Sequence, residues 1–298
     1  MTGDSSRVDG SVIDEGLVRA LIEEQFPQWR QLPVTRVVLD GNDHRSFRLG
    51  DDLVVRLPSA PGYLPQVRKE QEWLPRLAPA LPLPIPEVRG AGVPSLLFPA
   101  PWSVYGWIHG EPATLRPPDE PERFAADLAG FLVALRAADP TGGPAPGEHS
   151  LFRGAPVGHY ADEMEYLVER VSGRERDVVD GLWRDALEAP FGGAPVWLHG
   201  DVSLNNLLVR DGRLSAVIDF GCSAVGDPAC DTTILWTHFT GAARARFRHE
   251  LAVDDATWAR GRGWTVWKAL IMIGNRPPEQ RAFGRRVLDE LIAEHDAA

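Results

Sequence analysis

The spacing of apolar residues changes from a helical to a strand-like pattern within the first sixty positions. Between residues 13 and 22, aliphatic side chains recur at helical spacing, and Pro27 would end that helix. Three short apolar runs follow at residues 34–39, 46–49 and 53–57, and turn sequences rich in Gly, Asn and Asp separate them. This pattern predicts one helix followed by three consecutive antiparallel strands.

The rest of the chain becomes helical toward its end. A proline-rich stretch at 81–88 predicts an extended connector, and residues 95–98 and 102–108 predict two more strands. Helical repeats of apolar residues cover 63–77, 124–135, two segments within 158–190, 258–273 and 278–295. We therefore expect an α+β fold with a sheet-containing N-terminal lobe at residues 1–104 and a mostly helical C-terminal lobe at residues 105–298.

Residues 196–221 interrupt the helical half with a pattern of strand, polar loop, strand, turn and strand. Asp201 and Asp219 stand at two of the joints, and Asn206 follows Asp201 by five residues. One carboxylate can accept the proton of an attacking hydroxyl, while the second carboxylate and the amide oxygen can hold Mg²⁺ against nucleotide phosphates. The alternative is that these acids are ordinary turn residues, but their ordered spacing favours a phosphoryl-transfer site.

These motifs resemble a known family. The sequence HGD at 199–201, the Asn five residues later, IDFG at 218–221 and GDPACD at 226–231 are similar to the aminoglycoside phosphotransferase family. That family includes macrolide phosphotransferases and resembles choline and other small-molecule kinases. The resemblance implies a two-lobed protein-kinase-like fold, with an antiparallel-sheet N-lobe that binds ATP or GTP and a C-lobe with a helical substrate-binding region. It also implies that Asp201 positions and deprotonates an acceptor hydroxyl, and that Asn206 and Asp219 bind Mg²⁺.

The same kinase-like pattern identifies three nucleotide-binding candidates in the N-lobe. Arg56 lies in an apolar strand where kinases place a phosphate-contacting lysine, and a guanidinium suits phosphate and carboxylate contacts. Glu70 falls on the apolar stripe of its predicted helix, so its carboxylate needs a partner, and we expect Arg56 to be that partner. The alternative is a surface pair of Glu70 with Arg68 or Lys69. Ser46 is expected to donate a hydrogen bond to the phosphates, together with neighbouring backbone amides.

The segment at 102–111 resembles the hinge between kinase lobes, where backbone groups read the nucleotide base. Val104, Tyr105 and Gly106 are the expected hinge residues. The chain contains no Gly-Lys-Ser or Gly-Lys-Thr sequence, so a P-loop nucleotide site is excluded. The glycine-rich GxGxxG loop of protein kinases is also missing, as is common in the family that the chain resembles.

Charge and composition narrow the range of partners. With 31 basic and 42 acidic residues the chain has a formal net charge of −11, which argues against a nucleic-acid partner. Most of the acidity lies beyond Tyr105, where it serves either to attract a cationic substrate or simply to keep the protein in solution. Asp162, Glu163 and Glu165 are candidates to meet a substrate amine, although such residues usually form a solvated face. Neither a signal core nor an apolar run of membrane length is present, so we expect a cytoplasmic protein with no membrane partner.

The acceptor is the least determined part of the prediction. An aminoglycoside has the best support from the resemblance, and a macrolide or an endogenous sugar or amino alcohol is the alternative. A protein kinase would carry an activation segment after Asp219, but only a few residues separate Phe220 from Asp227. A nucleotide-binding pseudokinase that acts by interaction would lack a catalytic acid, yet Asp201 is present. The sequence predicts no oligomeric state.

Overall fold

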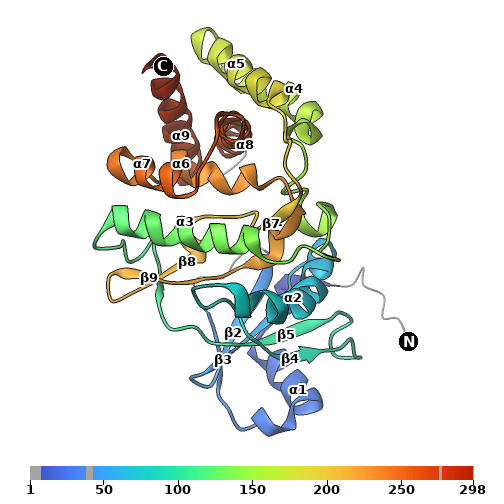
Figure 1. Ribbon diagram of the computed structural model, residues 1–298. Coiled ribbons are helices and arrows are strands. Elements are labelled where there is room, and N and C mark those ends of the chain that lie inside the picture. The colour runs from blue at the N-terminus through green and yellow to red at the C-terminus, as the bar shows by residue number, and fades with distance from the viewer. Residues whose placement is uncertain (1–7, 38–42, 275–276, 298) are drawn as a thin grey trace.

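The N-terminal region is built on one antiparallel sheet with a helix on each side (Figure 1). The computed structural model describes residues 8–37, 43–274 and 277–297. The strand order is β1-β2-β3-β5-β4, with β1 (Val34–Arg36), β2 (His44–Leu49), β3 (Leu53–Pro58), β4 (Val88–Gly92) and β5 (Trp102–Gly106). The helices are α1 (Glu15–Gln25) and α2 (Leu64–Leu77). The predicted first helix and three strands are confirmed, except that the end of the first strand and the following Gly41 and Asn42 lie outside the described residues.

Because side chains alternate along each strand, one face of the sheet packs in a core with α1 and the other face points toward the rest of the molecule. Phe47, Leu49, Val55 and Leu57 point to the same side and are fully buried in the core that includes the apolar residues of α1. Ser46, Val54 and Arg56 alternate with them and therefore face the other side. These alternate positions therefore face the space between the sheet and the rest of the molecule.

One predicted strand is wrong, and a different segment takes its place in the sheet. Residues 95–98 form a turn closed by a hydrogen bond from the Ser95 N–H to the Phe98 carbonyl oxygen (2.9 Å). Leu96 is completely exposed, so the apolar run that suggested a strand does not mark a buried element. The strand beside β5 is β4, whose Gly92 pairs with Trp102; a Cβ at Gly92 would lie 2.3 Å from the Trp102 indole nitrogen. Small residues are required there because the indole occupies the space.

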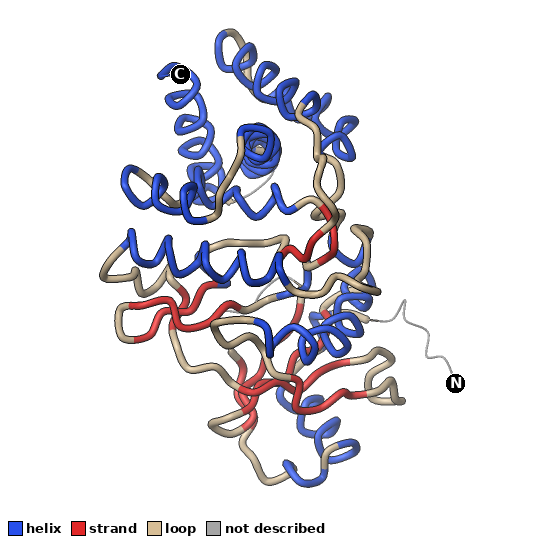
Figure 2. Tube along the Cα trace, in the orientation of Figure 1, coloured by secondary structure: helices blue, strands red, loops and turns tan. Residues whose placement is uncertain are grey.

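The C-terminal region combines seven described helices with two small sheets, as Figures 1 and 2 show. The helices are α3 (Pro121–Ala137), α4 (Ala161–Leu167), α5 (Arg174–Glu188), α6 (Ile234–Thr237), α7 (Gly241–Glu250), α8 (Asp255–Ile273) and α9 (Pro278–Ala297). The strands are β6 (Glu111–Pro112), β7 (Val196–Leu198), β8 (Leu207–Arg210), β9 (Arg213–Val217) and β10 (Ala224–Gly226). The helices predicted from apolar spacing are confirmed, whereas α6 and α7 were not predicted.

The strand pattern at residues 196–221 is confirmed as β7, β8 and β9. β8 and β9 form an antiparallel hairpin whose turn residues Asp211 and Gly212 have φ angles of +52° and +73°. Positive φ at both central positions suits the right-handed twist of a two-residue hairpin. Strand β5 runs across the predicted lobe boundary between residues 104 and 105. The division of the chain into two lobes at that boundary stays a prediction.

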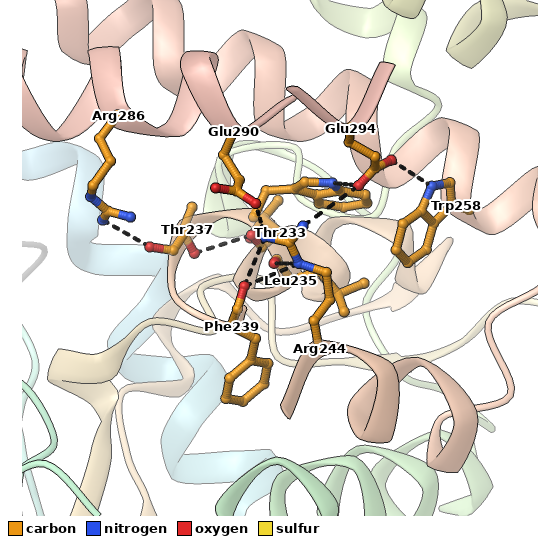
Figure 3. Close-up of polar contacts among 10 residues, drawn as sticks. Thr233, Leu235, Thr237, Phe239, Arg244, Trp258, Arg286, Glu290 and Glu294 are labelled. Atoms are coloured by element: carbon orange, nitrogen blue, oxygen red, sulfur yellow. Dashed lines mark hydrogen bonds and ion pairs between the residues drawn. The ribbon is translucent and has the colours of Figure 1, made fainter. Parts of the chain in front are cut away.

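A polar network ties the last helices together (Figure 3). Arg244 of α7 donates to the carbonyl oxygens of Leu235 and Phe239 and pairs with Glu290 of α9 at 2.7 Å. Glu294 of α9 accepts from the indole nitrogens of Trp236 and Trp258 at 2.6 and 3.0 Å. Helices α6, α7, α8 and α9 are therefore joined by charge-assisted hydrogen bonds as well as by apolar packing. Among the described helices, none is both long and apolar enough to cross a bilayer.

Candidate functional site

A cavity of about 530 Å³ lies between the N-terminal sheet and the β8–β9 hairpin. Its volume is in the range of sites that bind small molecules or nucleotides. Val54, Ile108, Leu208 and Ile218 contribute apolar walls. Six of the nine predicted site residues line the cavity, namely Ser46, Arg56, Tyr105, Gly106, Asn206 and Asp219. Glu70 and Val104 are buried outside it, and Asp201 lies beside it.

The loop that carries Asp201 is fixed by two buried side chains. Asp231, in the 3₁₀ helix Pro228–Thr233, accepts hydrogen bonds from the backbone N–H groups of His199 (2.9 Å) and Gly200 (2.7 Å). The His199 ring accepts at Nδ1 from the Asp201 N–H (3.3 Å) and donates from Nε2 to the Ile218 carbonyl oxygen (3.0 Å). His199 and Asp231 together hold the backbone of this loop in place.

Backbone conformation is constrained at Gly200, next to Asp201, and at Asp219. Gly200 has a φ angle of +84°, and a Cβ there would lie 2.3 Å from the Cys222 carbonyl oxygen, so a side chain does not fit. Asp219 itself has a φ angle of +67°, which is uncommon for a residue other than glycine. Such conformations cluster where the surrounding structure holds a functional group in place.

Asp201 and Asn206 are in direct contact. The Asn206 Nδ2 donates to the Asp201 carbonyl oxygen (2.9 Å) and to its Oδ2 (3.1 Å). The amide nitrogen of Asn206 thereby faces Asp201. Lys268 of α8 approaches the other carboxylate oxygen, with its Nζ 3.4 Å from Asp201 Oδ1. Asp201 keeps 40% of its side chain exposed, which leaves it open to a substrate.

The predicted pair between Arg56 and Glu70 is wrong. The Arg56 guanidinium instead pairs with Asp219 at 3.2 Å. Burial alone would lower the pKa of Arg56, but the carboxylates of Asp219 and Glu70 outweigh it and raise that pKa. The helical phase placed Glu70 on a buried face correctly, but it could not tell which group Glu70 meets there.

Glu70 has a different partner, which is the predicted hinge residue Tyr105. The Tyr105 hydroxyl donates to Glu70 Oε2 at 2.6 Å, and both side chains are buried. Burial raises the pKa of the Glu70 carboxyl, and the nearby Arg56 opposes that shift only in part. Glu70 therefore acts through Tyr105, a residue of the cavity wall, rather than through a direct bond to Arg56.

The neighbouring Lys69 was not predicted to matter, but it connects α2 to the segment after Asp219. Its Nζ donates to the carbonyl oxygens of Gly221 and Ser223 at 2.7 Å each, and to that of His149 at 3.2 Å. Burial lowers the pKa of Lys69 to about 8. The sequence carried no signal for these contacts, because the acceptors are backbone carbonyl oxygens far away in the chain.

The residues of the predicted hinge that line the cavity extend slightly further along the sequence than expected. Val104 faces the α1 core, and its strand neighbours are Val55 and Gly90. Tyr105 and Gly106 do line the cavity, and so do Trp107 and Ile108, which were missed. The cause is the two-residue repeat of a strand, which sends Val104 to the opposite face from Tyr105.

The residues next to the hairpin fit a magnesium ion. Asn206 has its amide nitrogen directed at Asp201, so its oxygen is the atom available as a ligand, and Asp219 adds a carboxylate. Mg²⁺ in nucleotide sites commonly uses one or two such protein oxygens and completes its shell with phosphates and water. The described part of the chain contains no group of three or more His, Cys, Asp or Glu residues that could hold a metal ion, so a metal here would depend on the phosphates and water as well. Burial, and next the charge of Asp219, raises the pKa of nearby Asp43 to about 6.

Comparison with known proteins agrees with this geometry. A family model described as the phosphotransferase enzyme family matches residues 34–264. Aminoglycoside 3'-phosphotransferases from Escherichia coli and Salmonella typhimurium are each 31% identical over 81 residues, which is 26% of this chain and 30% of each relative. The match therefore spans less than a third of those relatives.

Solved structures with the same fold cover nearly the whole chain. The GDP and kanamycin complex of APH(2")-IIia has a TM-score of 0.75 at 21% identity, over 93% of this chain and 98% of that one. Macrolide 2'-phosphotransferase MphH from Brachybacterium faecium has a TM-score of 0.64 at 20% identity, over 93% and 98%. At these identities the likeness establishes the fold. The predicted two-lobed kinase-like α+β fold and the resemblance to aminoglycoside and macrolide phosphotransferases are confirmed.

Proposed function

Because the chain belongs to the phosphotransferase enzyme family, we propose that it transfers the γ-phosphoryl group of ATP or GTP to a hydroxyl of a small molecule. The observation that carries this proposal is the contact between Asp201 and Asn206 at the edge of a cavity that Asp219 and Arg56 also line. The proposed base (Asp201), two metal ligands (Asn206 and Asp219) and a cation (Arg56) thus lie around one end of a cavity large enough for a nucleotide. Phosphoryl transfer requires little beyond such positioning and charge stabilisation.

Each residue has a distinct role in the proposed reaction. Asp201 accepts a hydrogen bond from the acceptor hydroxyl, orients it toward the γ-phosphorus and takes its proton. Asn206 restrains the Asp201 carboxylate through its Nδ2 and presents its oxygen toward the cavity. Arg56 orients the phosphates together with Asp219, and Ser46 contributes a hydroxyl on the same face of the sheet. Tyr105 and Gly106, with Trp107 and Ile108, contact the base.

Mg²⁺ is the expected cofactor, and Asn206 and Asp219 are the residues that would hold it. Bound there, the ion supplies positive charge that offsets the charge developing on the transferred phosphoryl group. The pairing of Asp219 with Arg56 keeps one carboxylate oxygen oriented before any ligand binds. This arrangement reduces the reorganisation required when the nucleotide arrives.

The names of the relatives suggest two acceptor classes, aminoglycosides and macrolides. An aminoglycoside therefore remains a candidate acceptor, with a macrolide or an endogenous sugar or amino alcohol as alternatives. A pseudokinase acting only by interaction is disfavoured, because Asp201 is present, is held by contacts with His199, Asn206 and Lys268, and is still exposed.

The test is a transfer assay with γ-labelled ATP or GTP against aminoglycosides, macrolides, sugars and amino alcohols, with products identified by mass spectrometry. We expect Asp219→Asn to lose magnesium-dependent nucleotide binding while it remains folded, because the substitution keeps the side-chain shape and removes the charged ligand. Nucleotide titrations with and without Mg²⁺ measure this loss. If the wild type and Asp219→Asn show the same dependence on magnesium, the metal assignment is wrong.

A further inference from the structure

Two cationic residues lie near the loop that carries Asp201, outside the nucleotide cavity. Lys268 of α8 has its Nζ 3.4 Å from Asp201 Oδ1. Arg153 approaches the neighbouring residue, since its Cβ lies 3.0 Å from the position that a Cβ at Gly200 would take. Neither Arg153 nor Lys268 lines the nucleotide cavity. If Asp201 receives the acceptor hydroxyl, the acceptor lies next to these two cations.

Arg153 is held in an orientation that leaves its hydrogen-bond donors available. Its Cζ lies 4.5 Å from the ring centroid of Trp267 and 5.4 Å from that of Trp264. Trp264, Trp267 and Lys268 share one face of α8 because they are three and four residues apart. An arginine stacked on an indole uses its flat face and keeps its N–H groups in the plane, where they match a carboxylate or a phosphate. No carboxylate of the described residues forms an ion pair with Arg153.

Both carboxylates near Arg153 and Lys268 already have partners. Asp201 is the sole ion-pair partner of Lys268 among the described residues. Glu163, one of the acids predicted to meet an amine, accepts a hydrogen bond from the Trp267 indole nitrogen at 2.8 Å. Burial, together with the charges of Arg286 and Lys268, lowers the pKa of His238 to about 4, so this ring stays neutral at physiological pH. A polycationic acceptor would have to place amines beside Arg153, with which no carboxylate of the described residues pairs, and beside Lys268.

We propose that Arg153 and Lys268 bind an anionic group of the acceptor, so that the substrate is a hydroxyl compound bearing a carboxylate or a phosphate. This inference rests on the proposed function, because it takes the space beside Asp201 as the acceptor site. It selects an anionic substrate class over the aminoglycosides. Arg153 provides the planar pair of donors, and Lys268 provides a point charge between that group and the reacting hydroxyl.

Matched hexoses test the charge preference directly. Glucuronate, glucose 6-phosphate, glucose and glucosamine have similar rings but carry a carboxylate, a phosphate, no charge and an amine; kanamycin adds a polycation. Binding of each is measured by calorimetry on protein loaded with Mg²⁺ and a non-hydrolysable nucleotide analogue. We expect at least one anionic hexose to bind about tenfold or more tightly than glucose and glucosamine. Arg153→Gln should weaken that binding by about 10- to 100-fold, the usual effect of losing a hydrogen bond to a charged group.

Two variants complete the test. Arg153→Lys should retain part of the preference because it keeps the charge and loses the planar fork. Arg248→Gln is the matched control, since Arg248 also stacks on an indole, 4.0 Å from the Trp258 centroid, but pairs with Asp255 on the surface. The inference is overturned if anionic hexoses are not preferred, or if Arg153→Gln keeps the preference. Transfer to kanamycin that depends on Asp201 but not on Arg153 would overturn it while leaving the proposed function intact. Preferred anion binding without any Asp201-dependent transfer would instead support the anion site and contradict the proposed reaction.

Discussion

The two sides of Asp201 are built in different ways. On the nucleotide side, Asp201, Asn206 and Asp219 come from one short stretch of chain, and buried backbone contacts hold them in place. On the acceptor side, Arg153 and Lys268 come from distant parts of the sequence and are positioned by stacking and a single ion pair. In the proposed reaction the chemistry is thus carried by the hairpin and its loop, while selectivity would depend on side chains that can change independently. Substitutions should therefore abolish turnover on the first side and alter the choice of acceptor on the second.

The largest expected effect separates turnover from nucleotide binding and comes from a substitution of Asp201. Asp201→Ala removes the proposed base, which should lower the turnover rate by about 10²- to 10⁴-fold. Nucleotide affinity should be nearly unchanged, because Asp201 does not line the nucleotide cavity. Steady-state kinetics and a nucleotide titration on the same preparation measure both quantities. Asp180→Ala is the control: Asp180 lies within helix α5, its side chain is 51% exposed, and it does not line the cavity. Unchanged turnover in Asp201→Ala would exclude it as the base.

The hairpin side was largely predictable from the sequence for a physical reason. Asp201 and Asn206 are separated by a short loop, so their spacing in the chain limits their spacing in space. The turn at Asp211 and Gly212 likewise determines the register of β8 and β9. Local sequence therefore carried most of the information about this part of the site.

Residues whose partners lie far away in the sequence could not be predicted in the same way. Helical phase placed Glu70 on a buried face, but the choice between Arg56 and Tyr105 depends on how α2 packs against β5. Lys69 entered only as a surface partner in the alternative pairing of Glu70, whereas it is buried against three carbonyl oxygens. β4 was hidden by its glycines, because Trp102 fills the space beside Gly92 and Phe26 fills the space beside Gly90. In each case the missing information is a tertiary contact.

A second prediction concerns how firmly the nucleotide side is anchored. Lys69→Met would leave the carbonyl oxygens of Gly221, Ser223 and His149 without their ammonium donor, and an unsatisfied buried acceptor costs about 1–3 kcal/mol. We expect the free energy of unfolding to fall by about 2 kcal/mol or more. Chemical denaturation measures this change. Lys268→Met substitutes the chain's other lysine, which bonds no carbonyl oxygen, and should be much less destabilising. Equal losses in the two variants would refute the anchoring role of Lys69.

The smallest expected effect is a change in the pH dependence of stability, which reports how Arg286 and Lys268 affect the pKa of His238. Burial, then Arg286 and Lys268, holds its folded-state pKa at about 4, below the ordinary value of 6.5. The unfolded chain therefore binds a proton at higher pH than the folded chain, and stability is lost as the pH falls from about 6.5 toward 4. Between pH 6.5 and 5.5 this group should remove about 1 kcal/mol from the free energy of unfolding.

His238→Gln should lack that loss, and Lys268→Met should reduce it, because one of the charges that disfavour the imidazolium is gone. Asp43, whose pKa is raised to about 6, acts in the opposite direction but is present in all three proteins, so it cancels in the comparison. Denaturation curves at the two pH values measure the difference, and an identical pH dependence in wild type and His238→Gln would show that His238 does not sense these charges.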